Sequence, residues 1–135
     1  MTSNAIAARA MAQLGTPFRM RGRTPGVALD CIGLALVALG PLAKSNLPCP
    51  NYAMRGDYQS IVRSYFAELP FRALAGGEAA SDGDILLASP APSQLHLLVT
   101  ANGGWVHAHA GLGRVVFTPE WPNWPILHRW RFTGD

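Results

Sequence analysis

The chain has 135 residues and a mass of 14.5 kDa, the size of one ordinary domain, so we expect a single domain over residues 1–135. Hydrophobic residues make up 49% of the sequence and charged residues 14%, which excludes a disordered or acidic-tail protein. The net charge of +3 is far below the dense basic surface that nucleic-acid binding requires. The sequence predicts neither a membrane-spanning helix nor a secretory signal in its first nine residues.

Two amphipathic helices are predicted in the first half of the chain. Residues 3–14 begin at a possible capping Ser3 and present one apolar face, formed by Ile6, Ala10, Met11 and Leu14. Residues 57–69 present a second apolar stripe, formed by Ile61, Tyr65 and either Phe66 or Leu69.

A third helix is predicted between these two, over residues 31–39. The segment is apolar on every side, which is typical of a central buried helix. Asp30 precedes it as a natural N-cap, and Gly40 with Pro41 follows as a stop signal. A buried strand is the alternative, but the capping residues favour a helix.

From residue 70 onward the sequence indicates strands that alternate with Gly, Asn and Pro turns. The predicted strands cover residues 71–74, 84–88, 95–100, 105–110, 114–118 and 126–132. Helices followed by a meander of strands are typical of an α+β fold with a mostly antiparallel sheet.

Cys31 is the strongest candidate nucleophile, because it opens the predicted buried helix directly after the capping Asp30. A thiol there faces unpaired backbone N–H groups and the positive end of the helix dipole, which lower its pKa. The same amides could stabilise an oxyanion formed when the sulfur attacks a carbonyl. The alternative is a small buried hydrophobic residue. Cys49 lies between Pro48 and Pro50, without a helix N-terminus to activate it, and is predicted to be structural or incidental.

Three of the four histidines fall on two predicted neighbouring strands. His107 and His109 are two residues apart and therefore share a face. A turn at Asn102-Gly103 sets His96 opposite His109, whereas a turn at residues 101–102 sets it opposite His107. Either register places the three imidazoles on one face.

These histidines are compatible with three roles. One can serve as the base for Cys31 while a second orients its ring through the Nδ1 side of His96. All three could instead bind zinc, or they could be partly exposed strand residues without a shared role. The sequence alone leaves His107 and His109 open as the orienting residue, and the better hairpin turn favours His109.

Four segments together resemble NlpC-type cell-wall peptidases, a group of papain-like cysteine peptidases. The resemblance covers nearly the whole chain in the right order, and it implies a papain-like α+β fold with the nucleophile on the buried helix. The segments are residues 15–34, which include Asp30-Cys31-Ile32-Gly33-Leu34, then Asp82-Gly83-Asp84-Ile85-Leu86, Leu95-His96-Leu97-Leu98-Val99 and Trp105-Val106-His107-Ala108.

The resemblance implies an endopeptidase that cleaves peptidoglycan stem peptides without a metal or other cofactor. Cys31 would be the nucleophile, His96 the general base and His107 the residue that orients it. Asp30, Phe18 and Arg19 would lie at the substrate-binding site.

Two residues of the substrate site depart from the pattern of this family. Phe18 stands where these enzymes often have a tyrosine, and Ile32 stands where they often have a serine. The sequence therefore matches the catalytic residues better than those that determine which bond is cleaved.

Within this family, the chain is most similar to the short variant encoded with phage tails and gene transfer agents. That variant has an Arg/Gly loop before the nucleophile and a last strand that contains Trp-Arg, as in Arg129-Trp130-Arg131. Tail proteins are therefore expected partners. Delivery by a tail particle, or release by lysis, would bring the enzyme to the cell wall. The alternatives are a tail-tip component with little activity, and a papain-like amidase or acyltransferase that acts on another substrate.

Overall fold

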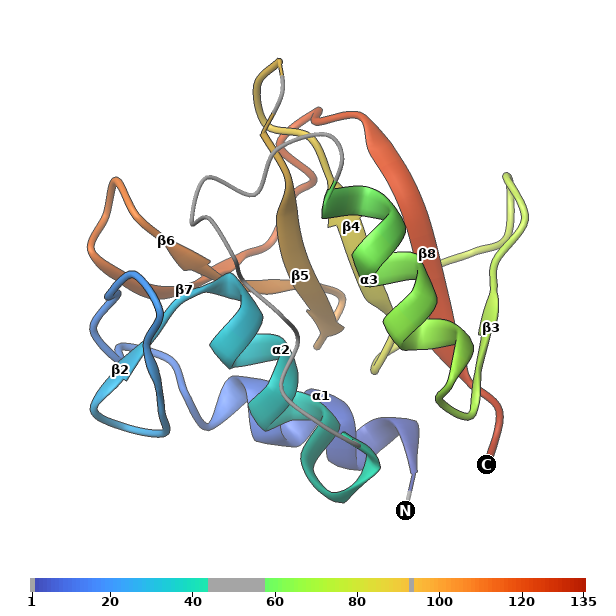
Figure 1. Cartoon of the computed structure of the whole chain (residues 1–135), viewed down its shortest axis with the longest axis horizontal. Helices are drawn as coiled ribbons and strands as arrows, with labels where there is room; N and C mark the ends of the chain where they lie inside the picture. The colour runs from blue at the N-terminus through green and yellow to red at the C-terminus, as the bar shows by residue number, and fades with distance from the viewer. Residues whose placement is uncertain (1, 44–57, 93) are drawn as a thin grey trace.

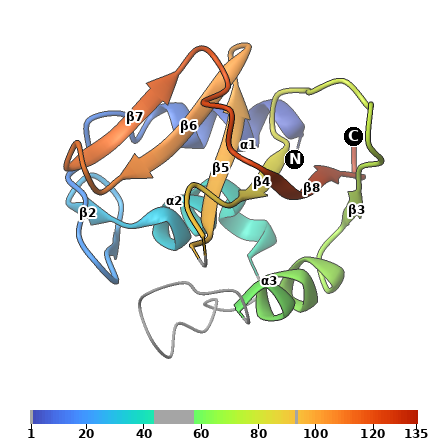
Figure 2. The same ribbon diagram turned by 90° about the horizontal axis from the view of Figure 1, so that it is seen from above.

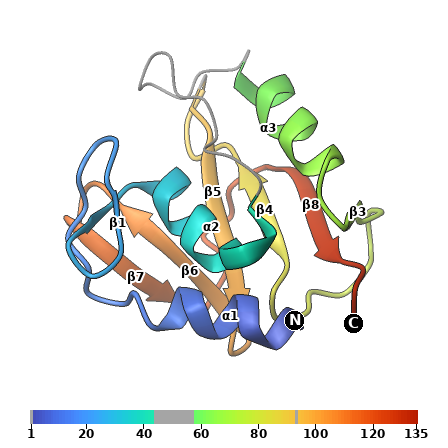
Figure 3. The same ribbon diagram turned by 60° about the horizontal axis from the view of Figure 1, so that its bottom comes forward.

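The computed structural model describes residues 2–43, 58–92 and 94–135. Helices α1 (Ser3–Met11) and α2 (Cys31–Leu39) lie together against one face of a six-stranded sheet, as Figures 1 and 3 show. Helix α3 (Tyr58–Ala67) packs beside the opposite end of the sheet from β7 (Figure 2). A short 3₁₀ helix (Gly40–Leu42) follows α2. The expected α+β class is therefore confirmed.

All neighbouring strands of the main sheet are antiparallel, in the order β3-β8-β4-β5-β6-β7. The expected meander holds only for β4 to β7, because β8 returns to lie between β3 and β4. A separate two-stranded sheet joins β1 and β2. The strands are β1 (Arg23–Thr24), β2 (Ala28–Leu29), β3 (Phe71–Ala73), β4 (Ile85–Ala88), β5 (His96–Ala101), β6 (Gly104–His109), β7 (Arg114–Thr118) and β8 (Ile126–Phe132).

The hairpin between β5 and β6 has the register that the Asn102-Gly103 turn predicts. Ala101 pairs with Gly104, and both turn residues have positive φ, 51° for Asn102 and 76° for Gly103. This conformation matches the right-handed twist of the flanking strands. The turn therefore fixes how the histidine-bearing strands meet.

The predicted first helix needs correction at both of its ends. Thr2, and not Ser3, caps α1, because its hydroxyl accepts a hydrogen bond from the Ala5 N–H at 3.2 Å. The helix ends at Met11, so Leu14 lies beyond the helical periodicity and is 40% exposed.

The buried stripe of α3 is also different from the predicted one. Tyr58, Val62 and Phe66 are buried, whereas Ile61 and Tyr65 are only partly buried. Phe66 stacks on Trp130 of β8 with ring centroids 4.3 Å apart, and this contact sets the rotation of the helix. A tertiary contact therefore decided between two stripes that the sequence pattern allows.

The core lies between the sheet and the helices, and α2 contributes most of its own surface to it. A smaller apolar cluster covers the other face of the sheet, where Leu86 and Leu98 are packed against Trp105, Trp121 and Trp124. No helix in the described part of the chain is long and apolar enough to cross a membrane.

Candidate active site

Cys31 is the first residue of α2, as the sequence predicts. The Asp30 carboxylate accepts a hydrogen bond from the Gly33 N–H at 2.7 Å and thereby caps the helix. Gly33 is needed because a Cβ there would lie 2.1 Å from the carbonyl oxygen of Gly22. This close approach places the loop of residues 19–27 against the helix terminus that carries the thiol.

Asp30 serves this loop and helix rather than the pocket. Its side chain has no exposed surface, and besides capping α2 it accepts hydrogen bonds from the Arg21 N–H at 3.0 Å and the Arg23 guanidinium at 2.6 Å. A buried carboxylate with three donors is well satisfied. In this structure the Asp30 carboxylate holds the turn before Cys31 together, and its contact with a substrate stays a prediction.

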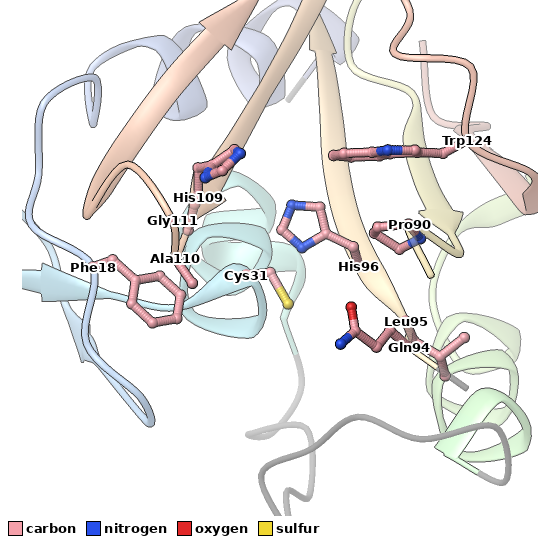
Figure 4. Close-up of a pocket in the computed structure, with 11 residues that line it drawn as sticks. Phe18, Cys31, Pro90, Gln94, Leu95, His96, His109, Ala110, Gly111 and Trp124 are labelled. Carbon is pink, nitrogen blue, oxygen red and sulfur yellow. The ribbon is translucent and has the colours of Figure 1, made fainter. Parts of the chain in front are cut away.

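The histidines form a hydrogen-bonded chain across three strands. His96 Nε2 lies 2.9 Å from His107 Nδ1, and His107 Nε2 lies 2.8 Å from the Thr118 hydroxyl oxygen. The expected orienting contact through the Nδ1 side of His96 is wrong, because Nε2 makes it. The Nδ1 atom is thereby left for the thiol, and Figure 4 shows the His96 ring beside the Cys31 sulfur.

His109 occupies a different position from the other two histidines. Its Nδ1 accepts a hydrogen bond from the Leu112 N–H at 3.0 Å, which ties the ring to the β6–β7 turn. The hairpin register places His96 directly opposite His109. The hydrogen bond of His96 is nevertheless made with His107, which lies on the same face of the sheet. Such diagonal pairs across an antiparallel sheet lie within reach of long side chains.

A pocket of about 320 Å³ opens in front of the thiol (Figure 4). Phe18 forms part of its wall, whereas Arg19 is not among its lining residues and is exposed next to Phe18. The lining residues are Phe18, Cys31, Pro90, Gln94, Leu95, His96, Ala108, His109, Ala110, Gly111 and Trp124.

Sequence reasoning missed Trp124 and Thr118. The Trp124 ring meets the rings of His96 and His107 edge-on, with centroids 5.7 Å apart in both cases. The Trp121 indole N–H donates to the Trp124 carbonyl at 3.0 Å and holds this loop over the sheet. The only sequence signal is two tryptophans in a proline-rich turn, which does not indicate the strand they cover.

Both paired histidines are held in the neutral form. Burial, followed by repulsion from His107 and His109, lowers the pKa of His96 to about 3. Burial, followed by repulsion from His109, lowers the pKa of His107 to about 4. At neutral pH the His96 ring is therefore a free base. Within the described ranges no group of three or more His, Cys, Asp or Glu residues is arranged to hold a metal ion.

These lowered values predict that the protein loses stability in mild acid. An unfolded histidine binds a proton near pH 6.5, whereas native His107 does so only near pH 4. The free energy of unfolding is therefore highest above pH 6.5, where His107 is neutral in both states. It falls as the pH decreases toward 4, and His107 accounts for a loss of about 2 kcal/mol at pH 5. Urea unfolding at several pH values measures this loss.

The His107→Asn variant provides the control for the acid effect, since it should remove the His107 share of the decline between pH 6.5 and 4 and leave the share that the lowered pKa of His96 contributes. Glu78, whose pKa is lowered to about 2 by its hydrogen bonds with Arg72 and the Ala75 N–H, affects stability only below pH 4.5. An unchanged pH profile in the variant would contradict the assignment of the acid effect to this histidine.

Searches of protein-family models and of curated proteins gave no match to the sequence. The fold, however, is similar to several solved structures. The NlpC/p60 domain of the peptidoglycan hydrolase SagA matches with a TM-score of 0.64 and 18% identity, over 98% of this chain and 100% of that chain. The peptidoglycan hydrolase RipB from Mycobacterium tuberculosis matches with a TM-score of 0.59 and 21% identity, over 96% and 63%.

NlpC1 from Trichomonas vaginalis matches with a TM-score of 0.65 and 16% identity, over 96% of this chain. The chain spans only 44% of NlpC1 and 48% of NlpC2 from the same organism. These structures give no support to the expected tail partners. They do agree with the helices and the antiparallel sheet described above, and we conclude that the chain has the fold of an NlpC/p60 domain.

Proposed function

We propose that this protein is a cysteine peptidase that cleaves peptide bonds in peptidoglycan stem peptides. The observation that carries the proposal is a thiol at a helix N-terminus, in a pocket shared with a neutral histidine that a second histidine orients. This is the arrangement that nucleophilic catalysis needs. Peptidoglycan is proposed because SagA and RipB are named as peptidoglycan hydrolases and have the same fold.

In the proposed first half of the reaction, His96 Nδ1 accepts the proton of Cys31. The sulfur forms a bond to the carbonyl carbon, and the carbonyl π electrons move to the oxygen, where backbone N–H groups at the start of α2 stabilise the charge. When the oxyanion collapses, the C–N bond breaks. The amine leaves with the proton that His96 held, and a thioester stays on Cys31.

In the second half, water takes the place of the amine. His96 accepts a proton from the water molecule while its oxygen bonds to the carbonyl carbon. The sulfur then leaves, the product is a carboxylic acid, and the proton on His96 returns the pair to its starting state. His107 acts throughout as the residue that holds the His96 ring, since its Nδ1 contacts the Nε2 atom.

Substrate binding is proposed to use Phe18 as an apolar wall and Arg19 as an exposed cation beside it. A guanidinium there could pair with a carboxylate of the stem peptide. Digestion of purified peptidoglycan, followed by mass analysis of the fragments, tests the proposal. New peptide termini that appear with the wild-type protein support it, and intact stem peptides after prolonged incubation would refute it.

The reactivity of the thiol gives a substrate-independent prediction. Cys31 should be alkylated by iodoacetamide with a pH inflection below about 8.5, in the range of roughly 3.5–7.5 found for activated cysteines, because it lies at the positive end of α2 beside a free base. Peptide mapping identifies the modified residue. An inflection at the free-thiol value would favour a structural cysteine instead.

A further inference from the structure

Thr118 stands at the far end of the histidine chain, at the last position of β7. It pairs with Trp105 across the sheet, so its side chain is on the face that carries His107, and its hydroxyl oxygen lies 2.8 Å from His107 Nε2. It does not line the pocket. We propose that Thr118 is a positioning residue that keeps the proton of His107 on Nε2, so that His96 can use Nδ1 as the base. This inference rests on the proposed function.

Two proton arrangements fit the observed distances. In the first, His96 Nε2–H donates to His107 Nδ1, and His107 Nε2–H donates to Thr118. In the second, Thr118 donates to His107 Nε2, and His107 Nδ1–H donates to His96 Nε2. A neutral imidazole carries one proton, so the second arrangement puts the His96 proton on Nδ1, where it cannot accept another.

Catalysis selects the first arrangement. When His96 has taken the thiol proton, both of its ring nitrogens carry hydrogen, and Nε2–H must donate to His107 Nδ1. The proton of His107 is then on Nε2, and only an acceptor can face it. The Thr118 oxygen is that acceptor, and it therefore stabilises the state in which the thiol has given up its proton.

The surroundings of His107 shield it from solvent. His107 is 1% exposed, and the Trp124 ring covers it edge-on, so bulk water does not reach its Nε2 atom. An N–H group buried without a partner costs about 1–3 kcal/mol. Among the described residues, His109 of β6 is the titratable group that repels a charge on both paired rings, whereas the Asp30 carboxylate is bonded to Arg23 on the loop side of α2. The hydroxyl of Thr118 adds no charge to this group.

The test compares Thr118→Val, which keeps the shape and removes the acceptor, with Thr118→Ser, which keeps the hydroxyl. We expect Thr118→Val to slow alkylation of Cys31 at neutral pH about 5- to 100-fold and to raise its pH inflection, and Thr118→Ser to restore most of the rate. Thr100→Val is the matched control. Its hydroxyl is buried without a hydrogen-bond partner among the described residues, so its loss should leave the alkylation rate unchanged.

A second variant pair separates positioning from a general loss of stability. Because Thr118 acts through His107, Thr118→Val should have no further effect on alkylation once His107 is replaced by alanine. If Thr118→Val slows the reaction equally in both backgrounds, or if Thr118→Ser fails like Thr118→Val, the positioning role is overturned.

Imidazole ¹⁵N NMR tests the proton position without any substrate. We expect His107 to carry its proton on Nε2 in the wild-type protein and in Thr118→Ser, and a proton on Nδ1 in the wild type would overturn the proposal. If the NMR result holds and peptidoglycan is not cleaved, the proposed substrate is wrong while the role of Thr118 stands.

Discussion

Replacing Cys31 by alanine or serine should abolish cleavage of stem peptides and leave the fold intact. The sulfur is the only atom proposed to bond to the substrate, and loss of a nucleophile lowers kcat by about 10⁴- to 10⁶-fold. The serine variant is nearly isosteric at a site that is 6% exposed, so its urea midpoint should stay close to that of the wild type. Mass analysis of digested peptidoglycan gives the activity, and far-UV circular dichroism checks the fold.

Cys49→Ser is the matched control, because it makes the same chemical change at the second cysteine of the chain. Cys49 lies outside the described residues, and its predicted incidental role is a sequence expectation. The variant should retain activity. If Cys49→Ser is inactive and Cys31→Ser is not, the nucleophile has been assigned to the wrong cysteine.

His96→Ala should have the next largest effect, a loss of about 10²- to 10⁴-fold in kcat, since the proton of the thiol then has no acceptor. His107→Ala should cost less, because the base is still present but its ring is free to turn. His107→Asn should recover part of the activity, since a carboxamide oxygen can accept the hydrogen bond from His96 Nε2. His109→Ala should be the mildest of the four, because its Nδ1 is engaged with the Leu112 N–H.

All four histidine variants should be measured in one assay, with the pH dependence of kcat/KM recorded for each active variant. A larger loss in His109→Ala than in His107→Ala would reverse the roles of these two residues. Equal loss in His96→Ala, His107→Ala and His109→Ala, together with zinc-dependent recovery of the wild type after chelation, would instead favour a metal site.

Short-range signals determined much of the fold from the sequence. Asp30 and Gly40 delimit α2 at the predicted residues, and the Asn102-Gly103 turn fixes the β5–β6 register. Strands β7 and β8 begin and end where their patterns predict. These signals are reliable because a cap or a tight turn is decided by backbone geometry within a few residues.

The choice of His107 over His109 came from the family resemblance, because the hairpin turn alone favours His109. The other candidate catalytic residues came from residue patterns, since Cys31 follows a cap and His96 shares a strand face with the other histidines. Their partners did not. The nitrogen of His96 that meets His107, and the hydroxyl of Thr118 behind it, depend on diagonal contacts between strands. A pattern of period two gives the face of a strand but not which neighbour on that face a side chain reaches.

Only the tertiary structure decided the surroundings of the site. The Arg23 guanidinium and the Arg21 N–H donate to the buried Asp30 carboxylate, and the Trp124 ring, from a distant turn, covers the paired histidines. The physical reason is the separation along the sequence between the residues that interact. Capping and turn formation involve neighbours in sequence, whereas burial, and with it the lowered pKa of each paired histidine, depends on segments that meet only when the chain has folded.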